Sequence, residues 1–302
     1  MSGKKFSDLE RMTTAEFEAA VSRTKAILNK YPVKYCFPKN IRSKDSFGDV
    51  DVYMHVNADE PTVCRIVAEL LFLDAPRQFN SFDSIRKVDP NGNVFGKVGN
   101  QVFLKTRNMD SDKPIMIDLN LCEKHEVEFK SLYHSYGHAS LLIDTLASRL
   151  NMHWKDNGLY LRINKQNKVL ITSNIETAMD ILWLDASVFD FGSEGFKHQH
   201  NLFAWIVASK FFDPDTFRNI GLDSRKNNSP LYQEFIESIA FIEQKRLINH
   251  TSSIHHVLNR IRDIDPALYN YVGLQVQQLY IKNAHDEKRL NAMYESLRLE
   301  QL

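Results

Sequence analysis

The chain of 302 residues is 43% hydrophobic and 25% charged, which is typical of a soluble globular protein with two domains, or with one large domain and an extension. Its formal net charge is zero and its pI is about 7.2, so any nucleic-acid binding must come from local patches rather than from an overall basic excess. Its three cysteines, Cys36, Cys64 and Cys122, form no Cys-x-x-Cys pair. This excludes a disulfide framework or a structural zinc site and favours buried thiols in a reducing compartment.

The sequence shows neither a secretory signal nor a membrane segment. Residues 1–5 are polar and no apolar core follows them. No apolar run approaches the length that spans a bilayer. We therefore expect a cytoplasmic protein without membrane contact, and a nuclear location or a viral origin stays open.

In chain order, the first half predicts a small antiparallel or mixed sheet backed by helices. Thr13 and Glu16 fit a capping box, which predicts a helix that ends near residue 29. Alternating apolar residues predict strands over 50–56 and 115–121. Further expected elements are a strand over 34–37, a helix over 60–73 with Pro61 in its first turn, and a hairpin of 94–98 and 101–106 around Gly99-Asn100.

The second half predicts a smaller mixed region and then helices only. We expect a helix over 136–150, a hairpin of 159–163 and 169–171, a helix over 175–184 and a linker over 187–195. From residue 196 the periodicity is helical, with helices over 200–212, 231–247, 253–262 and 266–299. The aromatic residues predicted to form the core of this last region are Phe203, Trp205, Phe211, Phe212 and Phe217.

Three acidic residues interrupt this pattern at positions that suggest a metal-binding or catalytic site. Asp49 and Asp51 follow Gly48 and project from the polar side of the 50–56 strand, and Asp118 lies in the middle of the apolar 115–121 strand. If the two strands are neighbours, the three carboxylates can hold two divalent cations roughly 3.5–4 Å apart, as phosphoryl-transfer sites do. The structural alternatives are solvated acids on an edge strand, and an Asp118 that pairs with Lys or Arg.

A basic loop precedes these acids, and other familiar catalytic motifs are missing from the sequence. Lys39, Arg42 and Lys44 lie in this loop, where they are either solvated or able to hold phosphates. The sequence has no Ser/His/Asp pattern, no P-loop and no dinucleotide glycine fingerprint. The histidines lack zinc-like spacing, which favours surface or packing roles for His198, His200, His250, His255 and His256.

The run NIRSKDSFGDVDV at 40–52 resembles the catalytic motif of the DNA polymerase β-like nucleotidyltransferase superfamily, and is most similar to the family X DNA polymerases. In that family a Gly-Asp-hydrophobic-Asp motif is followed by a third Asp on a later strand, which corresponds to Asp118, 67 residues after Asp51. The resemblance continues through LYHSYGHA at 132–139, KDNGLY at 155–160 and SNIETAMDILWL at 173–184, and it covers residues 34–190.

The chain departs from the family pattern in the nucleotide pocket. Pro38-Lys39 stands where the family has Gly-Ser, and Ile41 replaces one of its two arginines while Arg42 matches the other. Met116 lies where polymerases often carry an Arg. His134 and Ser135 replace the aromatic pair that packs on the sugar. The metal site therefore matches the family, and the nucleotide pocket is altered.

The resemblance implies an α+β fold with a palm-like mixed sheet, a small thumb-like subdomain and an all-α C-terminal domain. The expected boundaries are 1–133 for the palm-like catalytic domain, 134–195 for the thumb-like subdomain and 196–302 for the helical domain. It further implies a metal-dependent nucleotidyltransferase with two Mg²⁺ or Mn²⁺ ions held by Asp49, Asp51 and Asp118. The residues it assigns to the nucleoside triphosphate are Lys39, Arg42, Gly48, Ser135 and Gly137.

By the same resemblance, the expected acceptor is the 3′ end of RNA or DNA, with release of pyrophosphate. Only some 35 residues precede the catalytic region, so we expect a short-tract or terminal transferase, with tRNA as one acceptor, rather than a processive template copier. Two alternatives stay open. The chain could be an inactive nucleic-acid-binding or assembly protein on this fold, or it could transfer a nucleotide to a protein or a small molecule.

Overall fold

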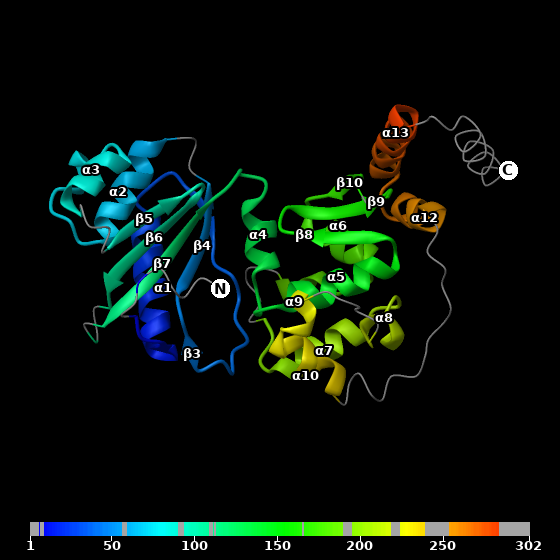
Figure 1. Ribbon diagram of the computed structural model, residues 1–302, viewed down its shortest axis with the longest axis horizontal. Coiled ribbons are helices and arrows are strands. Elements are labelled where there is room, and N and C mark those ends of the chain that lie inside the picture. The colour runs from blue at the N-terminus through cyan, green and yellow to red at the C-terminus, as the bar shows by residue number, and fades with distance from the viewer. Residues whose placement is uncertain are drawn as a thin grey trace. The chain divides into compact units, whose positions relative to one another are not determined.

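The computed structural model describes residues 6, 9–55, 59–89, 94–108, 111, 113–164, 166–189, 195–218, 224–238 and 254–283 (Figure 1). The fold is α+β, as expected. The chain divides into two compact units, Met1–Tyr136 and Gly137–Leu302. This division lies three residues after the boundary predicted at 133, and the further boundary predicted at 195 falls inside the second unit.

The first unit is built on a mixed five-stranded sheet with the order β2-β4-β7-β6-β5. The strands are β2 (Lys34–Cys36), β4 (Val50–His55), β5 (Phe95–Val98), β6 (Gln101–Arg107) and β7 (Pro114–Leu121). β4 and β7 are parallel neighbours, and the remaining pairs are antiparallel. The predicted strands are thus confirmed, although Val56 lies outside the described residues. A short second sheet pairs β1 (Met12–Thr13) with β3 (Ser46–Phe47).

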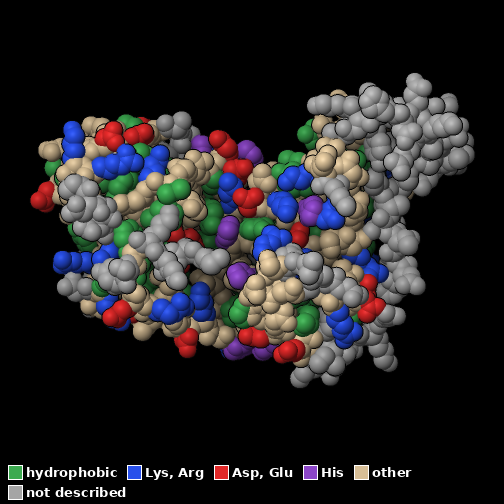
Figure 2. Space-filling model, in the orientation of Figure 1, with side chains coloured by type: hydrophobic (Ala, Val, Ile, Leu, Met, Phe, Trp, Pro, Cys, Tyr) green, Lys and Arg blue, Asp and Glu red, His purple; other side chains and the backbone are tan. Residues whose placement is uncertain are grey.

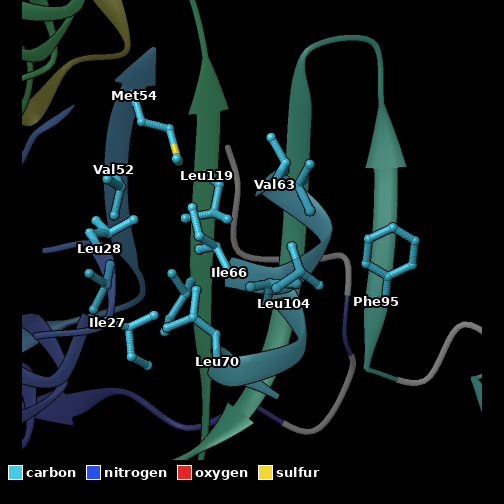
Figure 3. Packing of buried hydrophobic residues seen from close by; sticks show 14 of the residues in the cluster. Ile27, Leu28, Val52, Met54, Val63, Ile66, Leu70, Phe95, Leu104 and Leu119 are labelled. Carbon is cyan, nitrogen blue, oxygen red and sulfur yellow. The ribbon is translucent and has the colours of Figure 1, made fainter. Parts of the chain in front are cut away.

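Two predicted helices cover one face of this sheet. α1 (Thr14–Leu28) begins with the predicted capping box, in which the Thr13 side chain and the Glu16 side chain each accept a bond from the other residue's backbone N–H. α2 (Glu60–Leu70) has Pro61 in its first turn and ends three residues earlier than predicted. Figure 3 shows their apolar side chains packed against those of β4, β6 and β7. This layer forms the main core of the unit, and the other sheet face carries polar side chains together with a few buried apolar ones.

Short helices that the sequence did not reveal complete the first unit. η1 (Pro76–Gln78) and α3 (Phe82–Val88) follow α2. On the opposite side of the sheet, α4 (Val127–Tyr133) packs against β2 and β4 through Val127, Cys36 and Tyr53. Cys36 and Cys64 are buried free thiols, as predicted, but Cys122 is only half-buried because it lies just beyond the end of β7.

The second unit contains a three-stranded antiparallel sheet with the order β10-β9-β8. β8 (Met152–Lys155) was not predicted, whereas β9 (Gly158–Arg162) and β10 (Lys168–Thr172) form the expected hairpin. A Cβ at Gly158 would lie 2.6 Å from the Leu170 side chain and 2.7 Å from the Thr172 carbonyl oxygen, and its φ is +154°. Glycine is therefore required at this position.

Helices surround this sheet and make up the described part of the region after residue 196. α5 (Ala139–Arg149) contacts β8, and α6 (Ile175–Ile181) contacts β9 and β10. The later helices are α7 (Gln199–Val207), α8 (Pro214–Arg218), α9 (Ser224–Asn227), α10 (Pro230–Glu237), α12 (Ile254–Ile264) and α13 (Pro266–Asn283), and η2 (Ala186–Phe189) precedes them.

The aromatic core predicted for this region is confirmed, because Phe203, Trp205, Phe211, Phe212 and Phe217 are all buried. The predicted extensions of helix over 239–247 and 284–299 lie outside the described residues, as do the side chains of His250, His255 and His256. None of the helices within the described ranges is both long and apolar enough to cross a membrane.

Candidate active site

Two of the three predicted acids are neighbours on one face of the parallel strand pair. Asp51 of β4 and Asp118 of β7 are direct neighbours in the strand register. Val50 and Val52 flank Asp51, and both point into the hydrophobic core. Because side chains alternate along a strand, Asp51 must project from the opposite face, and the same holds for Asp118 between Ile117 and Leu119. Adjacent strands lie about 4.8 Å apart, so the two acidic residues are close neighbours.

Asp49 adds a second negative charge beside Asp51. Burial, and then repulsion by the Asp49 carboxylate, raise the pKa of Asp51 from 3.8 to about 6, against weaker lowering by Asn120 and Lys44. This repulsion locates the two carboxylates within electrostatic range of each other. Asp118 is only 3% exposed, and a carboxylate is stable in such a place only when hydrogen bonds, charges or a cation compensate it.

Two amide side chains extend the polar face from β4 to β6. Asn120 lies two residues after Asp118 and therefore on the same face. Its Nδ2 donates to Asp51 Oδ1 at 3.4 Å, and its Oδ1 accepts from Gln101 Nε2 at 2.9 Å. The amide of Asn120 thus holds the Asp51 carboxylate across the strand boundary and is itself oriented by Gln101.

Two cations lie in this region, Lys44 near the acids and Arg11 near Lys44 and Gly48, and only Lys44 was expected. Lys44 lies within electrostatic range of Asp49 and Asp51, and its Nζ donates to Asn40 Oδ1 at 2.9 Å. Desolvation and the positive charge of Arg11 lower the pKa of Lys44 more than the two acids raise it.

Arg11 is the unexpected cation, and it reaches this region through the pairing of β1 with β3. It donates from Nε to Ser46 Oγ at 2.5 Å and from Nη2 to the Ser46 carbonyl at 2.9 Å. Its Nη1 lies 3.6 Å from where a Cβ of Gly48 would be. The sequence offered no signal for this residue, because it lies far from the GDVD segment and only the strand pairing brings it close.

Lys39 and Ser135 are brought together, although not in the way predicted. The Ser135 hydroxyl accepts a bond from the Lys39 backbone N–H at 2.8 Å and donates to the Ser131 carbonyl at 2.9 Å. The Tyr136 N–H donates to the Lys39 carbonyl at 2.7 Å. Ser135 is buried, and its hydroxyl both accepts and donates in these bonds, so its role in the structure is to fix the loop that carries Lys39.

The remaining predicted nucleotide-binding residues lie in varied settings. Arg42 is exposed on the loop between β2 and β3. Gly48 precedes Asp49 directly, and a Cβ there would make only ordinary contact with Arg11. Gly137 is the first residue of the second unit, with a φ of +66°. The predicted contacts of these residues with a nucleotide stay predictions.

No family model matches this sequence, and no curated protein sequence is significantly similar to it. The resemblance to nucleotidyltransferases therefore depends on the motif residues themselves and on how the fold arranges them.

The donor chemistry of the site suits a hard divalent cation, but the ligand set is incomplete as the side chains stand. Carboxylate and amide oxygens are the ligands that Mg²⁺ and Mn²⁺ prefer, and Asp49, Asp51, Asp118 and Asn120 supply both kinds. Among the residues that the structure describes, however, no group of three or more His, Cys, Asp or Glu side chains is arranged to hold a metal ion. The strand register places Asp51 and Asp118 side by side, but the predicted metal site stays a prediction.

Proposed function

We propose that this protein is a metal-dependent nucleotidyltransferase, which transfers a nucleoside monophosphate from a nucleoside triphosphate to a hydroxyl acceptor. The observation that carries the proposal is the parallel register of Asp51 with Asp118, with Asp49 in electrostatic range of Asp51. Carboxylates held this close repel one another and destabilise the fold unless a positive charge compensates them.

In this proposal Asp49, Asp51 and Asp118 hold the cations, and Asn120 keeps the Asp51 carboxylate turned toward them. Bound Mg²⁺ or Mn²⁺ would neutralise charge on the attacking and leaving oxygens. The acceptor hydroxyl oxygen forms a bond to the α-phosphorus, the bond from that phosphorus to the bridging oxygen breaks, and pyrophosphate leaves with the electron pair. The hydroxyl proton passes to solvent.

The cations beside the acids would bind the triphosphate. Lys44 and Arg11 lie next to Gly48 and Asp49, and Arg42 lies on the same loop. Arginine matches phosphate oxygens in a two-pronged geometry, and lysine provides a point charge. The bond from the Lys39 N–H to the Ser135 hydroxyl and the bond from the Tyr136 N–H to the Lys39 carbonyl hold this loop in place. We expect the acceptor to be a 3′ end of RNA or DNA.

The test is incubation of the full chain with labelled nucleoside triphosphates, Mg²⁺ or Mn²⁺, and a mixture of RNA and DNA. Wild-type protein should label one of the nucleic acids, and Asp49→Asn or Asp51→Asn should abolish labelling. Asp74→Asn is the matched control, because Asp74 is an exposed acid elsewhere in the first unit. Label on the protein itself or on a small molecule would show that the acceptor is not a nucleic acid. Undiminished labelling by the Asp51 variant would refute the site.

A second candidate is favoured by the incomplete ligand set among the described side chains. In this case the chain would be a binding or assembly protein that keeps the fold without the chemistry. Isothermal titration with Mn²⁺ separates the two candidates. Binding that Asp51→Asn abolishes supports the transferase, whereas no Mn²⁺ binding at millimolar concentration supports the second candidate.

A further inference from the structure

The three-stranded sheet of the second unit has two chemically different faces. Met152 and Trp154 of β8 and Leu161 of β9 are buried among the apolar residues of one face. The alternate residues project from the other face and remain at least partly exposed to solvent. The outward side chains that concern us are His153, Lys155, Tyr160, Arg162 and Lys168, and we call this set the basic face.

The basic face carries a local positive charge that the neutral chain as a whole lacks. Lys155, Arg162 and Lys168 come from the three strands, whose sequences MHWK, GLYLR and KVLIT contain no Asp or Glu. Figure 2 shows Lys, Arg and His side chains close together in the region of β8 and β9. A single-sign field of this kind attracts a polyanion.

The register arranges these side chains in rows across the sheet. Arg162 is paired with Lys168, and Tyr160 is paired with His153. Lys155 is paired with Gly158, which lies four residues before Arg162 on β9. This separation corresponds to about 13 Å along the strand at about 3.3 Å per residue. The cations are therefore spread along the face at separations that suit several phosphates rather than one.

An aromatic ring lies among the cations. The Lys168 Nζ is 4.4 Å from the centre of the Tyr160 ring, and the Tyr160 hydroxyl donates to Asn157 Oδ1 at 2.9 Å. The Arg162 Nε donates to His153 Nε2 at 3.0 Å, which holds the guanidinium over β8. Sequence-tolerant binding of single strands uses this combination of a basic surface with an aromatic side chain on which a base can stack.

Nearby acids reduce the field of the face only at its margins. Asp144 of α5 contacts His153 and lies near Lys155, but it also accepts a bond from the Trp154 backbone N–H at 3.1 Å and pairs with Lys226 at 3.7 Å. The charge of Asp144 is therefore largely compensated by these contacts inside the second unit. Asp156 is exposed in the turn between β8 and β9, at one end of the face.

We propose that the basic face binds a single-stranded nucleic acid, with phosphates on Lys155, Arg162 and Lys168 and an unpaired base on Tyr160. A single strand is favoured over a duplex because stacking on Tyr160 needs an unpaired base. It is favoured over a membrane surface because the apolar residue on this face, Leu170, is half-buried and packs over Gly158 rather than projecting as an anchor. The inference rests on the proposed function only in taking the bound strand as the acceptor.

The experiment measures fluorescence anisotropy of a labelled 20-nucleotide RNA and of the same sequence as DNA, with the full chain, in EDTA and without nucleotide. Lys155→Ala/Lys168→Ala should raise the Kd of the single strands at least about tenfold at 50 mM salt. Each lost phosphate contact lowers the slope of log K against log salt by about 0.7, so the double variant should lower it by about 1.4. Lys87→Ala/Lys197→Ala removes equal charge at exposed positions elsewhere and should change neither quantity.

Tyr160 separates stacking from charge. Tyr160→Ala should weaken binding about tenfold without changing the salt slope, whereas Tyr160→Phe keeps the ring and should bind like wild type. Equal binding by wild type and by Lys155→Ala/Lys168→Ala would overturn the proposal, as would a wild-type protein that binds anionic phosphatidylserine vesicles but neither oligonucleotide. Asp49→Asn should bind single strands normally. A wild-type protein that binds single strands but transfers no nucleotide would contradict the proposed function alone. A wild type that transfers nucleotide, but whose binding is unchanged by Lys155→Ala/Lys168→Ala, would contradict the basic face alone.

Discussion

Asp51→Asn should stabilise the metal-free protein at neutral pH, because it removes a carboxylate whose charged form the fold opposes. Burial and the neighbouring Asp49 raise the pKa of Asp51 from 3.8 to about 6. Between these two values the folded state binds more protons than the unfolded chain, so the free energy of unfolding falls as pH rises from about 4 to about 6. The shift of about two units corresponds to about 3 kcal/mol at about 1.36 kcal/mol per unit.

Since water still reaches Asp51, we expect the variant to gain between about 1 and 3 kcal/mol at pH 7.5. Urea denaturation in EDTA, followed by circular dichroism, measures this gain. It should shrink toward zero as the pH is lowered to 4, where the wild-type carboxyl is also protonated. Asp74→Asn should show no such gain at either pH. Mg²⁺ should raise the stability of wild type and leave Asp51→Asn unchanged. A variant no more stable than wild type at pH 7.5 would refute the electrostatic reasoning.

Three further substitutions test separate parts of the structure. Gly48→Ala should change the free energy of unfolding by less than about 0.5 kcal/mol, because its Cβ meets only Arg11 at 3.6 Å. The same substitution should slow nucleotide transfer if phosphates pass close to this backbone. Urea denaturation measures the first effect and single-turnover labelling the second. Ser135→Ala should cost about 1–3 kcal/mol in urea denaturation, because it leaves the buried N–H of Lys39 without its acceptor. Gly158→Ala should cost about 2 kcal/mol or more by the same measurement, since its Cβ would overlap the facing strand; a loss below about 0.5 kcal/mol would contradict the close approach seen there.

The elements predicted best from the sequence are those with a strong period of their own. The alternation of Val50, Asp51 and Val52 defines a strand with one buried face without any knowledge of its neighbours. The same reasoning placed Asp118 on the polar face of its strand. The metal-site hypothesis required the two strands to be neighbours, and the register shows that they are; their parallel direction was not predicted.

Features that depend on long-range pairing could not be read from the chain. Arg11 reaches Gly48 only because β1 pairs with β3. Asn120 orients Asp51 only because β4 and β7 share a register. β8 and α4 are too short to show a period, and their polar positions resemble those of loops. Side-chain contacts across strands are set by register, and register is a property of the whole sheet.

Like charges repel one another at the candidate site among both the acids and the cations, although Lys44 is also attracted by Asp49 and Asp51. Asp49 raises the pKa of Asp51, and Arg11 helps to lower the pKa of Lys44, so like charges repel each other in both pairs. A nucleoside triphosphate with its divalent cations offers the opposite sign to both clusters at once. Binding of such a ligand would relieve both repulsions, and the two clusters meet at Gly48, the position with the least side-chain bulk.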